Sequence, residues 1–145
     1  MKIGFEHKGN WEEAMRKLRR DYRKDLELLV AKTTQDTSRQ AKSGVPVRYS
    51  GIRQSIKPRV QGLQGEVSAR VHYAPYVEYG TGSQVNVPGE LREYAMQFKG
   101  KGLREVNRRA EPYLYPAFFV QRDRYFKGIK SLLRRAADKN FKRRL

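Results

Sequence analysis

The sequence predicts an α+β fold in which a small antiparallel sheet packs against a long N-terminal helix and a C-terminal helix. Three observations lead to this prediction: helical spacing of apolar residues near the N-terminus, alternating apolar and polar residues in the middle, and a second helical stripe near the C-terminus. A chain of 145 residues suits one domain with a modest core better than two independent domains. We therefore expect a single domain over residues 1–145.

The first helix follows a short N-terminal tail, and we expect tail and helix together to occupy residues 1–43. Its apolar positions recur in steps of three and four, close to the period of 3.6 residues. Asn10 suits the N-cap and Gly44 the C-terminal stop. A heptad seam would contain Asp25 and Lys32, so packing against a sheet or a neighbouring subunit is expected rather than a coiled coil. The expected inner face is Trp11, Met15, Leu18, Tyr22, Leu26, Leu29 and Thr33.

Residues 44–82 are expected to form the sheet. The period changes here to strict alternation, which is typical of a half-buried strand. Residues 55–60 are its expected hairpin partner across a loop at 61–65, and Pro58 places that partner at an edge or bulge. The inward positions of the second strand are Val67, Ala69, Val71 and Tyr73, and the outward ones are Glu66, Ser68, Arg70 and His72.

The remainder of the chain is expected to contain an arm and a last helix. Residues 83–103 form the arm, with a short helix that opens at Pro88-Gly89 and a flexible break at 99–102. Residues 104–145 form an extended segment and a basic helix, with Pro116 in its first turn. The expected apolar face of this helix is Phe118, Tyr125, Phe126, Ile129, Leu132, Leu133 and Ala136.

Positive charge is concentrated at the C-terminal end. The chain has 32 Lys and Arg against 15 Asp and Glu, a net charge of +17, and residues 116–145 carry +8 of it. Such clusters bind polyanions or acidic protein surfaces, although a solvated helix face is the alternative. No helix-turn-helix or finger signature is present, so non-specific phosphate contact stays open and sequence-specific DNA binding is not expected. The candidate contacts are Arg134, Arg135, Lys139, Lys142, Arg143 and Arg144.

Residues that support catalysis are not grouped in this sequence. With no cysteine there can be no disulfide, thiolate metal site or Cys nucleophile, and the two histidines, His7 and His72, read as lone surface residues. The carboxylates lie mostly beside basic residues on helices and form no acid–base pair. We therefore expect no enzyme, no catalytic residue, no metal and no cofactor. No signal peptide or membrane-spanning run is expected either.

Glu78 is the carboxylate that stands apart from this pattern. It lies in residues 73–82, where a strand is expected to end, a proline turns the chain and two tyrosines flank one acid. One interpretation is structural: Glu78 accepts backbone N–H bonds or pairs with an arginine in a turn. The other is an intersubunit salt bridge, in which the tyrosines supply amphipathic interface area.

Three blocks of sequence carry a resemblance to a known family. Residues 46–56, 73–81 and 111–118 resemble the gene-ten-like tail-completion family of HK-type tailed phages, in order and spacing over most of residues 10–140. The first block departs from the family pattern, because Arg48-Tyr49-Ser50 replaces an Asp-Thr pair and Ile52 replaces a leucine. An acidic contact in that turn is therefore expected to be missing or inverted. Residues 83–103 resemble nothing specific.

The resemblance implies a structural role in the virion. Family members are small α+β subunits at the neck or tail top that complete the tail and join it to the DNA-filled head, commonly as six-fold rings around the DNA channel. The implied partners are copies of the chain and neighbouring neck and tail proteins, after synthesis in the host bacterial cytoplasm. The alternative from the charge is a basic nucleic-acid-binding module with non-specific phosphate contacts.

A ring requires two different patches to meet around the circle. We hypothesise that the sheet edge at 55–60 and the turn at 76–81 form one patch, and that the 83–103 arm reaches the next subunit. The subunit-interface candidates are Ser55, Ile56, Tyr73, Tyr76, Glu78, Tyr79, Gly80, Thr81, Tyr113 and Tyr115.

Overall fold

A computed structural model of the chain describes residues 11–97 and 108–141. It contains a two-stranded antiparallel sheet with a long N-terminal and a long C-terminal helix, which confirms the predicted α+β class. In chain order the elements are α1 (Trp11–Gly44), η1 (Val47–Tyr49), α2 (Ser50–Ser55), β1 (Ile56–Gln61), β2 (Gln64–Ala69), α3 (Ala74–Tyr79), η2 (Gly82–Gln84), η3 (Gly89–Leu91), α4 (Arg92–Met96) and α5 (Leu114–Phe141).

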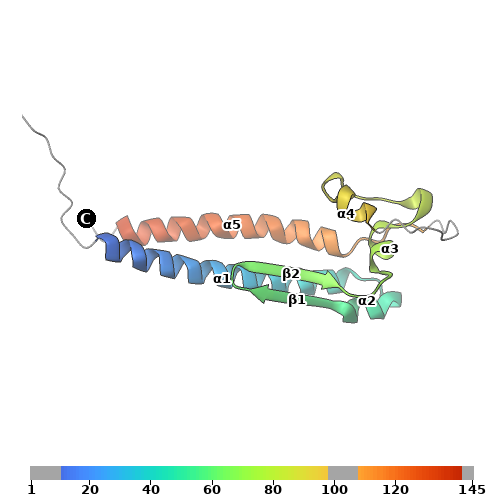
Figure 1. Cartoon of the computed structure of the whole chain (residues 1–145), viewed down its shortest axis with the longest axis horizontal. Helices are drawn as coiled ribbons and strands as arrows, with labels where there is room; N and C mark the ends of the chain where they lie inside the picture. Colours follow the sequence, from blue (N-terminus) through green and yellow to red (C-terminus); the bar gives the residue numbers. More distant parts are fainter. Residues whose placement is uncertain (1–10, 98–107, 142–145) are drawn as a thin grey trace, which may run out of the picture.

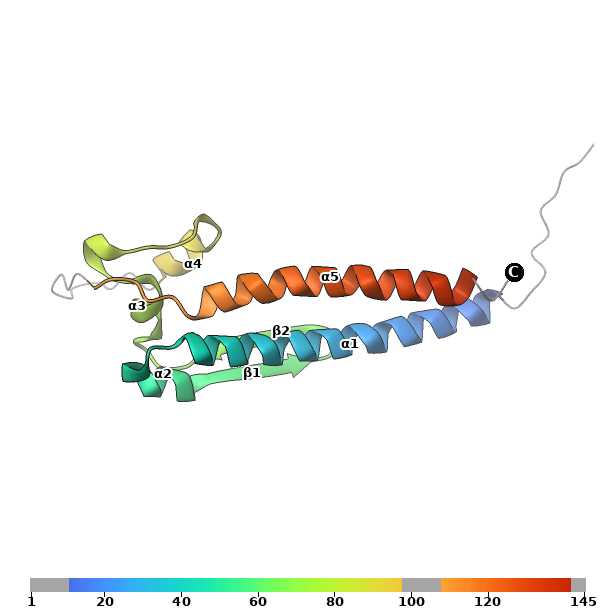
Figure 2. The same ribbon diagram turned by 180° about the vertical axis from the view of Figure 1, so that it is seen from behind.

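The two long helices, α1 and α5, lie side by side and antiparallel (Figures 1 and 2). Gln121 on α5 donates a 2.8 Å hydrogen bond from Nε2 to Gln40 Oε1 on α1. The hairpin β1–β2 packs on the C-terminal half of α1 and also contacts α2. The other ends of the two helices, residues 11–29 and 127–141, therefore project as a bare two-helix stem.

Gly128 sets the distance between the two helices of the stem. A Cβ added at Gly128 would lie 2.8 Å from Cδ1 of Leu29, so the leucine side chain rests on the glycine backbone. Gly128→Val is expected to lower the free energy of unfolding in urea by roughly 1–2 kcal/mol, because the added atoms overpack this contact. Adding Leu29→Ala should recover part of the loss, and additive losses in the double variant would contradict the proposed contact.

The predicted hairpin is confirmed, with a shorter loop and a shorter second strand. Ile56 pairs with Ala69 and Gln61 with Gln64, so the turn is Gly62-Leu63 rather than the predicted loop 61–65. Gly62 has φ +56°, as the first central residue of a type II′ hairpin turn requires. The strand ends at Ala69, and the prediction that it continued to Tyr73 was wrong, because the chain turns there to enter α3.

The hydrophobic core lies where the hairpin, α1, α3 and the start of α5 meet. Its buried side chains come from α1, α2, β1, α3 and α5 and from the chain next to two of these helices. Tyr49, Val67 and Tyr73 pack on its periphery. The core residues are Ala41, Val45, Ile52, Ile56, Val77, Tyr113 and Ala117.

The predicted face of α1 is correct only in part. Leu18, Tyr22, Leu26, Leu29 and Thr33 are half-buried, whereas Met15 is exposed. The fully buried positions lie on a second face that includes small or hydroxylated residues. Two of these hydroxyls are satisfied within the helix, since they donate to the carbonyl four residues earlier. The buried positions are Val30, Thr34, Thr37, Ser38 and Ala41.

The predicted face of α5 is wrong for three of its seven residues. Phe118, Phe126 and Leu133 are 49%, 54% and 51% exposed, respectively, while Leu132 is buried as expected. The buried positions of α5 are Ala117, Gln121 and Leu132, and Gly128 contacts α1. Small residues permit the close approach of α1, which turns the large apolar side chains outward.

The arm and the ends of the last helix agree with the prediction where they are described. The short helix near residues 89–98 is confirmed as η3 followed by α4. Pro116 lies in the first turn of α5, although the helix begins at Leu114 and shortens the expected extended segment. Asn10, Phe98 and the expected break at 99–102 lie outside the described residues.

Candidate functional site

The three sequence blocks, 46–56, 73–81 and 111–118, meet at the end of the molecule opposite the stem; we call this region the junction (Figure 1). Arg48 forms an ion pair with Glu111. A Cβ added at Gly51 would lie 2.6 Å from the hydroxyl of Tyr73, so these two segments also touch. Residues separated by more than sixty positions in the chain are thereby held in one place.

Glu78 joins α3 to the beginning of α5. Its carboxylate accepts hydrogen bonds from the backbone N–H of Tyr113 at 2.9 Å, of Leu114 at 2.9 and 3.1 Å, and of Tyr115 at 2.7 Å. N–H groups at the start of a helix have no partner within the helix, and the helix dipole favours a negative charge there. The interpretation that Glu78 accepts backbone N–H bonds is therefore confirmed. It sits on the six-residue helix α3, where a turn was predicted.

Burial governs the protonation of the groups around Glu78. It raises the pKa of Glu78, and the three backbone N–H donors partly offset that effect. Burial also raises the pKa of Tyr79 to about 12, with the negative charge of Glu78 as the second cause. The pKa of Tyr113 is raised for the same two reasons.

The raised pKa of Tyr79 predicts sensitivity to alkali. Above its ordinary value of 10.0 the tyrosine ionises in the unfolded chain, but in the fold it keeps its proton until the pH reaches about 12. The folded state then binds more protons than the unfolded state, so its stability falls as the pH rises through this range. We expect Tyr79→Phe to flatten this fall in urea unfolding between pH 9 and 11.5. An unchanged slope in the variant would contradict the assignment.

Gly80 and Thr81 fix the exit from α3. Gly80 has φ +75°, and an added Cβ would lie within 2.8 Å of backbone atoms of Gln84, Arg108 and Ala110. The N–H of Thr81 donates to the Arg108 carbonyl at 2.9 Å, and the Arg108 N–H donates to Thr81 Oγ1 at 3.0 Å. The base of the arm is thus tied to the segment that precedes α5.

Arg48, one of the residues that depart from the family pattern, forms an ion pair across the junction. Its ion-pair partner Glu111 stands just before α5, so the base lies on η1 and the acid on the other segment. The guanidinium of Arg48 also lies 4.9 Å from the ring centroid of Tyr49, and that of Arg108 lies 4.7 Å from it. The departed turn therefore makes a basic contact, and the expectation of a missing or inverted acidic contact stays a prediction.

The interface candidates fall into two groups. Ile56, Glu78, Gly80 and Tyr113 are buried and hold the subunit itself together. The rest keep part of their surface open, so they stay predictions for contacts between subunits. Two of these rings, Tyr79 and Tyr115, stack with centroids 6.3 Å apart. The partly exposed group is Ser55, Tyr73, Tyr76, Tyr79, Thr81 and Tyr115.

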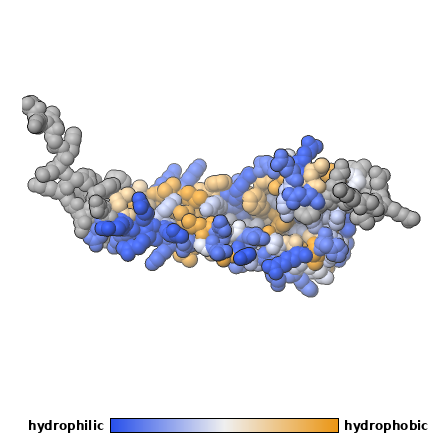
Figure 3. Space-filling view, in the orientation of Figure 1, coloured by the Kyte–Doolittle hydropathy of each residue, from blue (hydrophilic) through white to orange (hydrophobic). Residues whose placement is uncertain are grey.

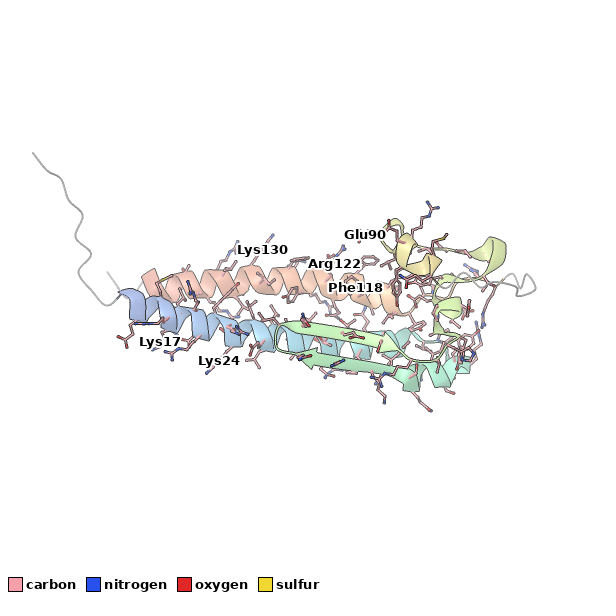
Figure 4. The ribbon with its side chains drawn as sticks, viewed as in Figure 1. Lys17, Lys24, Glu90, Phe118, Arg122 and Lys130 are labelled. Atoms are coloured by element: carbon pink, nitrogen blue, oxygen red, sulfur yellow. The ribbon has the colours of Figure 1, made fainter. Side chains whose placement is uncertain are left out.

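The basic candidates lie on the stem, away from the junction. Arg134, Arg135 and Lys139 are exposed on α5, whereas 142–144 lie outside the described residues. Figure 4 shows Lys130 on α5 and Lys17 and Lys24 on α1, all pointing away from the helix pair. Cationic side chains therefore project from both helices of the stem.

Two surface features were missed by the sequence reasoning. One is the exposed apolar stripe on α5, formed by Phe118, Phe126 and Leu133. The available signal was Gly128, a glycine within the predicted helix. It indicates that the side of α5 that carries Gly128, and not the aromatic side, approaches another element. The other is the edge of β2 that faces away from β1 in the two-stranded sheet. The sequence offered no signal for it beyond the proline on β1.

Residues 11–97 and 108–141 contain no group of three or more His, Cys, Asp or Glu that could hold a metal ion. None of the helices described there is long and apolar enough to cross a membrane. His72 is exposed in the turn before α3.

Comparison with known proteins finds a family match for residues 11–80. Residues 11–80 match the model of the HK97-gp10-like family, described as "Bacteriophage HK97-gp10, putative tail-component". No curated protein and no solved structure matches the chain. The matched range holds α1, the hairpin and α3, and therefore the first two of the three blocks that meet at the junction. The resemblance seen in the sequence is thereby confirmed over residues 11–80.

Proposed function

We propose, on the premise that residues 11–80 belong to the HK97-gp10-like family of phage tail components, that this protein forms a six-fold ring in the neck. The ring would complete the tail, join it to the DNA-filled head and surround the channel that DNA crosses. The observation that carries the proposal is the exposed apolar stripe on α5. Phe118, Phe126 and Leu133 lie at i, i+8 and i+15, so they share one side of the helix.

Burial of this stripe against another subunit favours assembly. Each square ångström of apolar surface removed from water contributes roughly 25 cal/mol, and contiguous exposed apolar patches commonly mark interaction sites. The partly exposed tyrosines of the junction offer a second, chemically different patch at the other end of the subunit. Two unlike patches are what a closed ring of identical subunits requires.

The basic surface of the stem suits a docking role in the same assembly. Positive charge lining the channel would hold DNA and slow its exit, so we place most of it against acidic surfaces of neighbouring neck or tail proteins. Replacing Arg134, Arg135 and Lys139 with serine is expected to reduce the yield of tailed particles. The control is Lys32→Ser with Arg39→Ser and Arg124→Ser, which removes the same number of exposed cations outside the stem and the arm. Equal particle yield in both variants would count against docking.

Light scattering on nuclease-treated protein tests the ring. Six copies of a 17.0 kDa chain give about 102 kDa, and this mass should be insensitive to nuclease. Phe126→Ser with Leu133→Ser should shift the sample toward monomer while the circular dichroism of the fold is kept. A wild-type protein that stays monomeric up to millimolar concentration would contradict self-assembly.

A nucleic-acid-binding module is the second candidate, favoured by the basic residues exposed along the stem. Binding through phosphate contacts releases counterions, so the logarithm of its affinity would fall steeply with the logarithm of the salt concentration. Titration of double-stranded DNA at several salt concentrations distinguishes the two candidates. A steep salt slope together with a nuclease-sensitive mass would favour this alternative over the ring.

A further inference from the structure

The two strands of the hairpin differ in what their outer edges can bind. In an antiparallel pair, alternate residues turn their backbone groups toward the partner strand or away from it. The N–H of Ile56 donates to the carbonyl of Ile52 on α2, so Ile56 turns its backbone away from β2. By alternation Pro58 and Val60 also turn their backbone groups away from β2. The residues of β2 that pair with these three positions turn their backbone groups away from β1.

The outer edge of β1 is closed to strand addition. Ile56 has already used its N–H within the subunit, and Pro58 has none. Only Val60 keeps a donor on that side. The hypothesis that the edge at 55–60 receives a neighbour is therefore disfavoured, since proline and short free stretches are the means by which proteins block strand edges.

The outer edge of β2 is open. Gly65, Val67 and Ala69 turn their N–H and C=O groups away from β1. Within the described residues, none of these three N–H groups has a backbone acceptor outside the hairpin. Three successive outward positions give a regular set of donors and acceptors for one more strand.

The beginning of the stripe on α5, at Phe118, lies beside this open edge. Hydrophobic side chains gather along the stem in the view that has the hairpin in front, and Phe118 projects from α5 on the side nearer the hairpin (Figures 3 and 4). Gly65 faces α1, because a Cβ there would meet Thr34 and Val30. An added strand would lie next to β2 on the α5 side. Those of its side chains that face the same way as Gly65 would therefore point toward the helices and cover α5. The sheet covers α1 and stops short of α5.

The arm contains a segment that fits this place. Val85–Pro88 lies between η2 and η3, with extended dihedral angles at Val85 (φ −67°, ψ 123°), and it carries no charge that the basic surface would repel. The N–H of Asn86 donates to the Tyr79 carbonyl at 2.9 Å. In an extended segment Val85 and Val87 then direct their backbone groups the opposite way, off the subunit. Val85 is 54% exposed.

We propose that Val85–Val87 of one copy adds as a third strand to the outer edge of β2 in the next copy, with its valines over Phe118 of that copy's α5. This rests on the proposed ring and names its contact. The Val85–Val87 segment of one copy and the β2 edge of the next are different surfaces, so their contact is heterologous, as ring closure requires. Both surfaces belong to every subunit, so the contact repeats around the circle.

Engineered cysteines test the contact directly, because the chain has none of its own. Val67→Cys with Val85→Cys should give disulfide-linked dimers, trimers and larger species on oxidation, since residues opposite each other in a hydrogen-bonded pair have Cα atoms about 5.5 Å apart. The matched control is Val60→Cys with Val85→Cys, which places the first cysteine on the outer edge of β1. It should give no ladder.

The outcomes separate the contact from the ring. Oligomers by light scattering with no ladder from Val67 and Val85, or equal ladders from both pairs, would overturn the strand contact and leave the ring standing. A monomeric sample with no ladder would overturn both. Cross-linking of Val67→Cys to another tail protein in assembled particles would show a different occupant and also overturn the contact.

A proline pair gives an independent readout. Val67→Pro removes one outward donor from β2, whereas Val60→Pro removes one from β1, and neither N–H belongs to the ladder between the strands. Val67→Pro should weaken self-association by about tenfold or more, and Val60→Pro should leave it unchanged. Equal self-association of the two variants would contradict the proposal. If Val67→Pro does not fold, the cysteine pairs still decide.

Discussion

Glu78→Ala is expected to lower the free energy of unfolding by about 2–4 kcal/mol at pH 7. The carboxylate is 3% exposed and is the acceptor for three backbone N–H groups at the start of α5. Removing it leaves buried donors without partners, each of which costs roughly 1–3 kcal/mol, and the cost of burying the charge offsets part of the total. Urea unfolding followed by circular dichroism measures the change.

Two further variants make the Glu78 result specific. Glu78→Gln keeps one acceptor oxygen and should fall between the wild type and alanine. Glu93→Ala removes an exposed carboxylate from α4 and should stay within about 0.5 kcal/mol of the wild type. If Glu78→Ala were as stable as Glu93→Ala, the link between α3 and α5 would not hold the junction together.

Gly80→Ala should be at least as damaging, with an expected loss of about 3 kcal/mol or more. The residue has φ +75°, which disfavours any side chain, and an added Cβ would lie 2.6 Å from the Gln84 carbonyl oxygen and 2.7 Å from that of Arg108. These neighbours are backbone atoms, so they cannot move aside as a flexible side chain could. Thermal and urea unfolding both report the loss.

Two other glycines separate the causes of that loss. Gly62 also has a positive φ, but an added Cβ there would meet no atom within 4 Å. Gly62→Ala should therefore show the cost of backbone strain alone, a loss of roughly 1 kcal/mol in the free energy of unfolding. Gly89→Ala has neither feature and should be close to neutral. If Gly80→Ala and Gly62→Ala lowered the free energy of unfolding equally, the crowding around Gly80 at the base of the arm would contribute nothing.

Local sequence patterns were sufficient to predict the main elements of the fold. The helical period of α1, the hairpin and Pro116 at the start of α5 all depend on neighbours a few residues away, and all three were found. The strand's end at Ala69 was not, because alternation continues through Val71 and Tyr73 although the backbone turns. Alternation identifies one side of a segment and does not state its conformation.

The inner faces of the long helices depend on contacts far away in the sequence. A hydrophobic stripe predicts that a face will be covered, but α5 has both an aromatic side and a side of small residues. Gly128 permits a close approach to Leu29, and this packing determines which side faces α1. The aromatic side is then left for another partner, which the sequence of one subunit does not reveal.

The candidate site was predicted in outline and wrong in part. Glu78 was recognised as special, and one of the two roles weighed for it is the observed one. Its partners could not be named, since Tyr113 and Leu114 are more than thirty residues away in the chain. The open edge of β2 follows from hairpin register and the Ile56 hydrogen bond, neither of which a residue pattern contains.

Single-particle imaging of the assembled phage neck tests the central proposal most directly. We predict a closed ring of copies of this chain at the top of the tail, with Phe118, Phe126 and Leu133 of each copy covered by its neighbour. A ring position occupied by other proteins alone, or copies of this chain whose α5 stripe faces solvent, would contradict the account.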